Sequence, residues 1–368
     1  MNIEITEQLL PITMVGSYPR PPWYRQQLEG RDLLEAFKLD EYEQTYADAV
    51  SCIIREQERA GLDVVTDGQM YFDDYGGSIG SFTWYWHERL AGFARAKLPS
   101  PIAAGADEVD ADILNNWGGV WAEGKIGPGP IRLATMHRIA ARDATRPLKP
   151  CVGAGPLNLA IHVTYDHPDS YYRGLHDLVE DLIPVFNAEM RELADAGARI
   201  VQLEDLGAWM PLIPAYGVDS DFVVDVINRT IEGVEAKIAW HFCLGNAYGN
   251  ANISVWGGML DRVLPPLYES NVDQFVLDFA LRDMSDVGIL STLPQDKEVA
   301  AGVIDVRSLQ IESAQQIADR MRKVLDVVPA DRVWFTTDCG LRNLPRFVAF
   351  EKLKSMHAAA EIVRAEVA

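Results

Sequence analysis

The chain has 368 residues, of which 48% are hydrophobic, and its 54 Asp and Glu against 33 Lys and Arg give a formal net charge of −21. This length suits one large domain or two ordinary ones, and the composition of an ordinary globular protein excludes a disordered, collagen-like or coiled-coil chain. The negative charge argues against nucleic acid and anionic membrane surfaces as partners, so we expect a site for small molecules.

The first residues, MNIEITEQLLPITMVGSYPR, carry acidic side chains where a signal peptide has a basic start and an apolar centre. No run of about 18 apolar residues follows anywhere in the chain, so we expect a cytoplasmic protein. Its four cysteines are too few and too scattered for a disulfide framework. Those that matter are expected to be metal ligands or nucleophiles.

Strands and helices alternate in the predicted secondary structure. Eight short β-branched or apolar runs that end in polar or Gly residues predict strands at 13–17, 62–67, 150–155, 200–205, 237–241, 275–278, 301–305 and 333–338. Apolar residues at helical spacing predict helices at 40–60, 178–196, 219–233 and 309–325. Gly61 and Gly197 follow two of these helices, where a left-handed cap is wanted. Eight βαβ units predict an α/β fold, a (β/α)₈ TIM barrel with a parallel sheet.

Residues 70–148 interrupt this alternation. They contain the aromatic run Phe82-Thr-Trp-Tyr-Trp-His87 and the Gly/Pro-rich Ile126-Gly-Pro-Gly-Pro130, with little helical period. We interpret them as an insertion after the second strand of a single domain spanning 1–368, placed over the C-terminal rim of the barrel. The insertion either shapes the substrate pocket, where its aromatic residues would suit a short hydrocarbon, or simply packs as a hairpin.

Residues of metal-ligand type gather at the predicted strand ends, where barrel enzymes keep their working residues. His241 and Cys243 end the fifth strand, Asp278 ends the sixth, and Cys339 follows the eighth. A set of two Cys, one His and one carboxylate suits zinc, and ligands so far apart in sequence argue for a catalytic site. The alternative for His241 and Cys243 is an ordinary buried Cys beside a satisfied His.

At these residues the chain resembles the catalytic C-terminal half of cobalamin-independent methionine synthase. The resemblance covers nearly the whole chain and lies in Val15-Gly16-Ser17-Tyr18-Pro19-Arg20, in the His-x-Cys pair, and in Asp338-Cys339-Gly340-Leu341. Asp278 stands where the family has a zinc-binding Glu. The resemblance implies a zinc ion that binds a small thiol as a thiolate, which attacks an electrophilic carbon of a small alkyl donor.

The chain departs from the family at positions that bear on the substrate. Where the family has a Glu that holds the amino group of homocysteine, this chain has Gln69, although Glu204 or Asp205 could serve. Arg307 replaces the family's general-acid His; an Arg does not release a proton at neutral pH, but it could clamp a sulfonate or carboxylate, stabilise an alkoxide, or form a plain ion pair. A single barrel of negative charge also disfavours a polyglutamyl folate donor.

These departures resemble a related branch, epoxyalkane:coenzyme M transferase, in which no amino group needs a carboxylate and a sulfonate needs a cation. We therefore predict epoxide opening by coenzyme M, with methyl transfer to homocysteine as the alternative. Arg307, Asp338 and Tyr18 are the predicted catalytic residues, and Asp338 could also orient a ligand. The predicted substrate contacts are Ser17, Gln69, Glu204, Asp205 and Arg307.

Two further hypotheses remain open from the sequence. The first is a barrel without catalysis, whose zinc is structural or which carries a small thiol. The second is a decarboxylase of the uroporphyrinogen type, which needs a cluster of arginines for a polyacidic ligand; the candidates are Arg20, Arg307, Arg342 and Arg346. Association into a homo-oligomer is compatible with each hypothesis.

Overall fold

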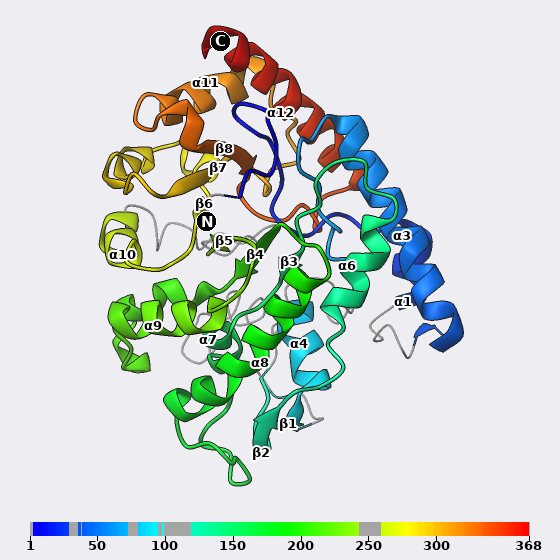
Figure 1. Cartoon of the computed structure of the whole chain (residues 1–368), viewed down its shortest axis with the longest axis vertical. Coiled ribbons are helices and arrows are strands. Elements are labelled where there is room, and N and C mark those ends of the chain that lie inside the picture. The colour runs from blue at the N-terminus through cyan, green and yellow to red at the C-terminus, as the bar shows by residue number, and fades with distance from the viewer. Residues whose placement is uncertain are drawn as a thin grey trace.

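The computed structural model has a mixed α/β architecture in which helices surround a parallel sheet (Figure 1). The residues it describes are 3–28, 36–37, 39–72, 80–94, 98, 119–242 and 259–367. None of the helices among these residues combines the length and the apolar character needed to cross a membrane.

The main sheet contains six strands, each parallel to its neighbours and arranged in chain order. They are β3 (Cys151–Val152), β4 (Ile200–Glu204), β5 (Lys237–His241), β6 (Gln274–Leu277), β7 (Glu298–Ile304) and β8 (Val333–Thr337). The third to eighth predicted strands are thus confirmed. Each of these buried apolar runs pairs with at least one neighbouring strand, as the strands of a buried parallel sheet do.

The first two predicted strands are present only as extended segments joined by single bridges. Ile12 pairs with Phe335 of β8, and Val65 pairs with Leu148 just before β3. Backbone hydrogen bonds support both contacts: Thr13 N–H donates to the Phe335 carbonyl over 2.9 Å, and Lys149 N–H donates to the Val65 carbonyl over 2.8 Å. These segments therefore lie between β8 and β3, although each is too briefly paired to count as a strand.

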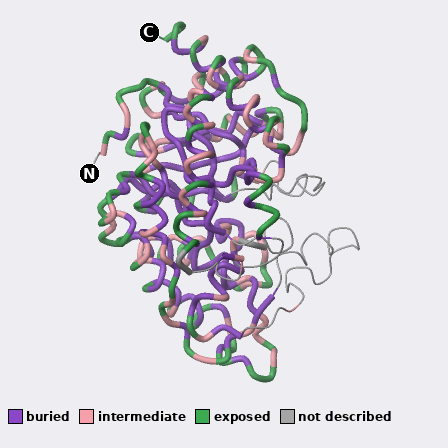
Figure 2. Tube along the Cα trace, turned by 90° about the vertical axis from the view of Figure 1, so that its right-hand side faces the viewer, coloured by how far each residue is buried: buried purple, intermediate pink, exposed green. Residues whose placement is uncertain are grey.

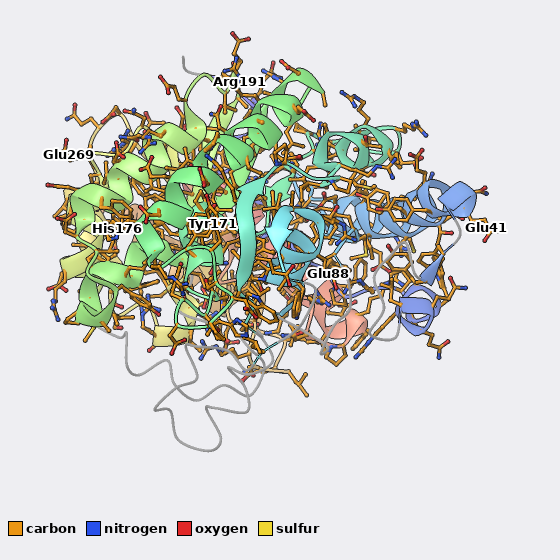
Figure 3. The ribbon with its side chains drawn as sticks, turned by 90° about the horizontal axis from the view of Figure 1, so that it is seen from below. Glu41, Glu88, Tyr171, His176, Arg191 and Glu269 are labelled. Atoms are coloured by element: carbon orange, nitrogen blue, oxygen red, sulfur yellow. The ribbon has the colours of Figure 1, made fainter. Side chains whose placement is uncertain are left out.

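Helices follow most of the strands and form the outer layer (Figure 1). The longer helices are α3 (Leu39–Ala60), α8 (Leu175–Asp195), α9 (Ser220–Ile231), α10 (Leu260–Leu267), α11 (Ala314–Leu325) and α12 (Arg346–Val367). Short ones are α1 (Pro22–Leu28), α7 (Pro156–Ala160), and the 3₁₀ turns η3 (Leu206–Leu212), η4 (Pro214–Tyr216), η6 (Ala280–Arg282), η7 (Val287–Thr292) and η8 (Ala330–Arg332). From below, Glu41 on α3 and Glu269 after α10 lie at opposite sides of the molecule (Figure 3).

Two of the predicted helix ends are confirmed in their backbone geometry. Gly61 follows α3 with a φ of 95°, and Gly197 follows α8 closely with a φ of 100°. A side chain at either position would be strained in this left-handed region, which is why the sequence places glycine there.

The segment 70–148 carries its own small elements. Its described parts form α4 (Gly80–Arg89), α6 (Leu133–Ala141) and an antiparallel pair of strands, β1 (Ala91–Phe93) and β2 (Ala122–Gly127). The Trp86 ring stacks on Phe186 of α8 with a centroid distance of 4.1 Å, and Trp84 and Tyr85 are also buried. The aromatic run thus belongs to a packed helix, which favours the packing interpretation over a hydrocarbon pocket.

A small apolar cluster lies inside the sheet, separate from the large core between sheet and helices (Figure 2 shows the buried interior). Most of its members come from a strand or strand-like segment, and no two of these come from the same one. They are Ile5, Val15, Val64, Ile200, Ala239, Val276, Ala300 and Trp334. The two faces of the sheet therefore bury two distinct sets of side chains, as alternation along a strand requires.

Gly155 tests how tightly the strand ends are packed. A methyl group added there would lie 2.0 Å from Asp205 Oδ2, so the Gly155→Ala variant has to displace that carboxylate or shift the backbone. We expect a loss of about 2–4 kcal/mol in the free energy of unfolding, measured by urea denaturation.

The matched control is Gly288→Ala, where an added methyl group meets no atom within 4 Å among the described residues. Equal stability of the two variants would contradict the packing described here.

Candidate functional site

A chain of polar side chains crosses the carboxyl ends of the strand-like segment 62–67 and of β3 and β4. Glu204, at the end of β4, accepts a hydrogen bond at each oxygen: Gln69 Nε2 donates to Oε2 over 3.0 Å, and Gln202 Nε2 donates to Oε1 over 3.0 Å. Lys149 Nζ in turn donates to Gln202 Oε1 over 2.6 Å. Gln69 and Gln202 therefore fix the orientation of a carboxylate that is only 9% exposed.

Asp67 is a second buried carboxyl group beside Glu204. Its Oδ1 accepts a hydrogen bond from Gln69 N over 2.8 Å, and this turn holds Gln69 at a φ of 51°, which is unusual for a residue other than glycine. Burial, and to a smaller extent the charge of Glu204, raises the pKa of Asp67 to about 7 against the effect of this hydrogen bond. A strained backbone that presents two carboxyl groups is typical of a ligand site.

Gly16 and Gly340 have no side chain, which allows Glu204 and Gln69 to lie close to the first and Ser17 to lie close to the second. A methyl group on Gly16 would lie 2.6 Å from Glu204 Oε1, and one on Gly340 would lie 2.0 Å from Ser17 Oγ. The structure therefore brings together Ser17, Asp67, Gln69 and Glu204, here called the strand-end cluster, and places it against the segment that carries Cys339. The sequence predicted three of these four residues as substrate contacts.

Asp205 and Asp338 serve the backbone in this structure. The Asp205 carboxylate accepts hydrogen bonds from the N–H groups of Leu157, Asn158 and Gly207, over 2.7–3.1 Å, and so binds the starts of α7 and η3. The predicted substrate contact Asp205 thus has its oxygens directed at the backbone. Burial raises its pKa to about 6, while these hydrogen bonds oppose the rise.

Asp338, just after β8, plays the same part for the segment after β6. It accepts hydrogen bonds from the N–H groups of Phe279, Ala280 and Leu281, over 2.7–3.1 Å, directly after the predicted ligand Asp278. Burial and the nearby Asp278 carboxylate raise the pKa of Asp338. Asp338 thus ties the loop of Asp278 to the segment of Cys339, which fits an orienting role.

The ring of His241 is held in one orientation by the backbone. Its Nδ1 lies 3.0 Å from the Val276 carbonyl oxygen, which can only accept, so Nδ1 carries the proton and a neutral ring has its lone pair on Nε2. Asp278 is buried, with Oδ2 3.5 Å from Arg282 Nη1. Among the described residues no three His, Cys, Asp or Glu side chains gather closely enough to hold a metal ion, and the predicted ligand Cys243 lies outside those residues.

The two remaining predicted residues are Tyr18, whose backbone N–H donates to the Gly68 carbonyl over 3.0 Å, and Arg307. The Tyr18 side chain is fully buried beside Glu56 and Arg346 of α3 and α12, and burial together with Glu56 raises the pKa of its hydroxyl. Arg307 is half-buried in the loop after β7, where its backbone N–H donates to Asp305 Oδ1 over 2.9 Å. The roles of both residues stay predictions.

Sequence reasoning missed Asp67, Lys149 and Gln202 as site residues. Asp67 had a usable signal, because it ends a predicted strand as Asp205 does. Lys149 had no such signal in the sequence, since a lysine before a buried strand is normally exposed. In the structure its ammonium group is fully buried, and this burial lowers the pKa of Lys149.

Comparisons with known proteins agree on one family. A family model described as "Cobalamin-independent synthase, Catalytic domain" matches residues 10–103 and 168–362. The chain is 30% identical to proteins named methionine synthase from Sulfolobus acidocaldarius, with 100% of this chain and 95% of that protein covered, and from Saccharolobus solfataricus, with 98% and 96% covered.

A solved structure adds a similarity in three dimensions. It is that of a B12-independent methionine synthase from a Shewanella species in complex with selenomethionine, with a TM-score of 0.80, 25% identity, and 98% of this chain and 99% of that chain covered. These similarities confirm the methionine synthase resemblance. They do not show the narrower resemblance to epoxyalkane:coenzyme M transferase, and they favour the methionine synthase alternative over that leading prediction.

The raised pKa of Asp67 predicts a pH-dependent stability. Between the ordinary pKa of 3.8 and the folded value of about 7, the unfolded chain loses the proton first, so ionisation of Asp67 reduces stability as the pH rises. The Asp67→Asn variant should therefore gain stability relative to the parent chain, on the order of 2 kcal/mol more at pH 8 than at pH 5. Urea denaturation at both values measures this.

Asp296→Asn provides the control, because that side chain is 73% exposed. A stability difference for Asp67→Asn that is the same at both pH values would show that Asp67 is not a strained carboxyl group.

Proposed function

Because the chain belongs to the family of cobalamin-independent synthase catalytic domains, a family of transferases, we propose that it transfers a methyl group to the thiol of homocysteine. The observation that carries this choice of thiol is the presence of two buried carboxyl groups, Asp67 and Glu204, in the strand-end cluster. The related Shewanella enzyme was solved with an amino acid, selenomethionine, which supports the same choice.

The charges of the strand-end cluster favour an ammonium group. Asp67 and Glu204 together carry more negative charge than Lys149, the buried cation behind Gln202, can balance. A ligand ammonium would lower the cost of ionising Asp67 and would find Glu204 already oriented by two amide donors. A sulfonate such as that of coenzyme M would be repelled here. Because Glu204 supplies a carboxylate beside Gln69, the presence of Gln69 does not by itself argue against an amino acid as the thiol substrate.

The residues present fit zinc. We propose His241, Cys243 and Cys339 as ligands, with Asp278 as the fourth, because a neutral ring protonated at Nδ1 has its lone pair on Nε2, as a metal ligand requires, and two thiolates suit this ion. Zinc, when bound, lowers the pKa of a thiol and so provides a nucleophile at neutral pH.

The chain's own residues supply orientation. Asp338 holds the backbone after Asp278, and Ser17 contacts the Gly340 segment, so the loop of Asp278 and the strand-end cluster are both joined to the segment of Cys339. Glu204 holds the amino group of the substrate, and Arg307 provides a cation on the β7 side. An Arg cannot act as general acid, so we propose that the departing group of the donor takes its proton from water.

We also propose that the sheet closes into a (β/α)₈ barrel, with residues 70–148 as its insertion. Support comes from the hydrogen bonds of Thr13 to β8 and of Val65 and Lys149 before β3, and from the inner apolar cluster, to which both strand-like segments contribute.

Thiol selectivity tests the proposed function. The parent chain should form methionine from homocysteine with methyl iodide or methyltetrahydrofolate as donor, and should show no opening of a short epoxide by coenzyme M. Glu204→Gln should raise the KM for homocysteine at least tenfold, since an ammonium loses a charged partner worth about 1.5–3 kcal/mol, with a smaller change in kcat.

The control thiol is 4-mercaptobutanoate, which is homocysteine without its amino group, and Glu204→Gln should leave its KM nearly unchanged. The control variant is Glu180→Gln, in an exposed pair with Arg229. Epoxide opening with coenzyme M, or equal effects of Glu204→Gln on both thiols, would refute the proposal.

A further inference from the structure

A fully buried lysine lies close to the strand-end cluster, and the methyl transfer proposed above gives it no task. Lys149 stands just before β3, and its relative exposure is 0%. A buried ammonium group is costly unless a carboxylate or several acceptors compensate it. Among the residues that the structure describes, Lys149 forms no direct ion pair, and its Nζ donates to Gln202 Oε1 over 2.6 Å. The burial of this cation therefore needs an explanation.

Gln202 connects the ammonium group to Glu204. The two residues are two apart on β4, so their side chains point to the same side of the sheet, as does Ile200 of the inner apolar cluster. Cys151, two residues after Lys149, pairs in register with Gln202, which brings the lysine alongside β4 (Figure 1). Gln202 Nε2 then donates to Glu204 Oε1 over 3.0 Å. Lys149 and Glu204 are thus an ion pair bridged by one buried amide.

The chemistry of the two neighbours determines which way this amide points. An ammonium group only donates hydrogen bonds, and a carboxylate only accepts them. The Gln202 side chain therefore satisfies both in a single orientation, with its oxygen toward Lys149 and its NH₂ group toward Glu204. Without the ammonium group, the Gln202 oxygen would lose its donor while remaining buried, which favours rotation of the amide and loss of its hydrogen bond to Glu204.

The charges agree with a bridged pair. Burial lowers the pKa of Lys149, whereas the Cys151 thiol and the Glu204 carboxylate raise it. The second amide beside Glu204 is different, since Gln69 Nε2 donates to Glu204 Oε2 over 3.0 Å but Gln69 Oε1 is buried with no hydrogen-bond partner among the described residues. Of these two amides, only Gln202 is held by a cation.

We propose that Lys149 is a positioning residue for the ammonium group of the thiol substrate: through Gln202, it holds Glu204 in the orientation that accepts this group. The inference rests on the proposed function, because it concerns the same amino-acid site. It assigns part of the preference for an amino-acid thiol to a side chain inside the sheet that acts through another. A direct effect of the Lys149 charge would have the opposite sign, since a cation repels an ammonium group.

Calorimetric titration of the full chain tests this role without turnover. The ligands are L-methionine and 4-(methylthio)butanoate, which is methionine without its amino group. In Lys149→Met the Kd of L-methionine should rise about fivefold, because Glu204 loses a hydrogen bond that orients it. The Kd of 4-(methylthio)butanoate should stay nearly unchanged, which a general loss of structure would not produce.

A double-mutant cycle separates the route through Gln202 from the charge of Lys149. Gln202→Met changes no charge and should also raise the Kd of L-methionine about fivefold. In Lys149→Met/Gln202→Met the two effects should not add, because both remove the same support of Glu204. Additive effects, or a lower Kd in Lys149→Met, would show that the lysine acts by its charge and would overturn the proposal.

Lys237→Met is the matched control. Lys237 is also a buried lysine of the sheet, but it forms a direct ion pair with Glu298 on β7, and its replacement should leave the Kd of L-methionine unchanged. Urea denaturation verifies that each variant is folded. If Lys149→Met does not fold, Gln202→Met alone decides, since an unchanged Kd there would overturn the proposal.

Failure of this inference is distinguishable from failure of the proposed function. A parent chain that binds L-methionine, with variants that bind it equally well, would overturn the role of Lys149 and leave the proposed function intact. A parent chain that does not bind L-methionine would instead refute the amino-acid site itself, and the positioning role with it.

Discussion

Carboxyl groups buried at the carboxyl ends of the strands are the constraint on which the rest of the structure depends. A buried ionised group is costly unless hydrogen bonds compensate it. Asp205 and Asp338 meet this condition with three backbone N–H groups each, and so determine where the chain turns after β3, β4 and β6. Glu204 meets it with two side-chain amides instead, and Asp67 accepts a hydrogen bond from the backbone N–H of Gln69. Asp205 and Asp338 thus hold the backbone in place, whereas Glu204 and Asp67 give the site its negative charge.

This division connects the fold with the proposed chemistry. The strand-end cluster is negative and suits the ammonium of an amino acid thiol. The segment of Cys339 lies beside it, because Gly340 closely approaches Ser17. The proposed ligand Cys339 and the proposed ammonium site are therefore neighbours, which is a useful arrangement for holding the two ends of one small thiol.

Sequence patterns predicted the parallel sheet well because six of the strands are buried apolar runs with abrupt ends, and the glycine caps of α3 and α8 were predicted for the same local reasons. The segments 13–17 and 62–67 look the same in sequence, yet the extent of their pairing depends on distant partners that a local pattern does not reveal. Helix α4 was missed because its aromatic residues have weak helix propensity and are stabilised by packing, as in the stack of Trp86 on Phe186. For the site, residue type gave Glu204 and Asp205 the same predicted role. That Asp205 binds backbone N–H groups while Glu204 binds two side-chain amides follows only from which groups lie nearby in the fold.

The central claim is that a zinc ion held by His241, Cys243 and Cys339 binds the thiol of homocysteine beside the strand-end cluster. X-ray absorption at the zinc edge of the full chain, recorded before and after addition of homocysteine, tests it most directly. The account predicts one additional sulfur neighbour at about 2.3 Å when homocysteine is added and no such change with coenzyme M. A spectrum that is unchanged by homocysteine, or that gains a sulfur neighbour only with coenzyme M, would contradict it.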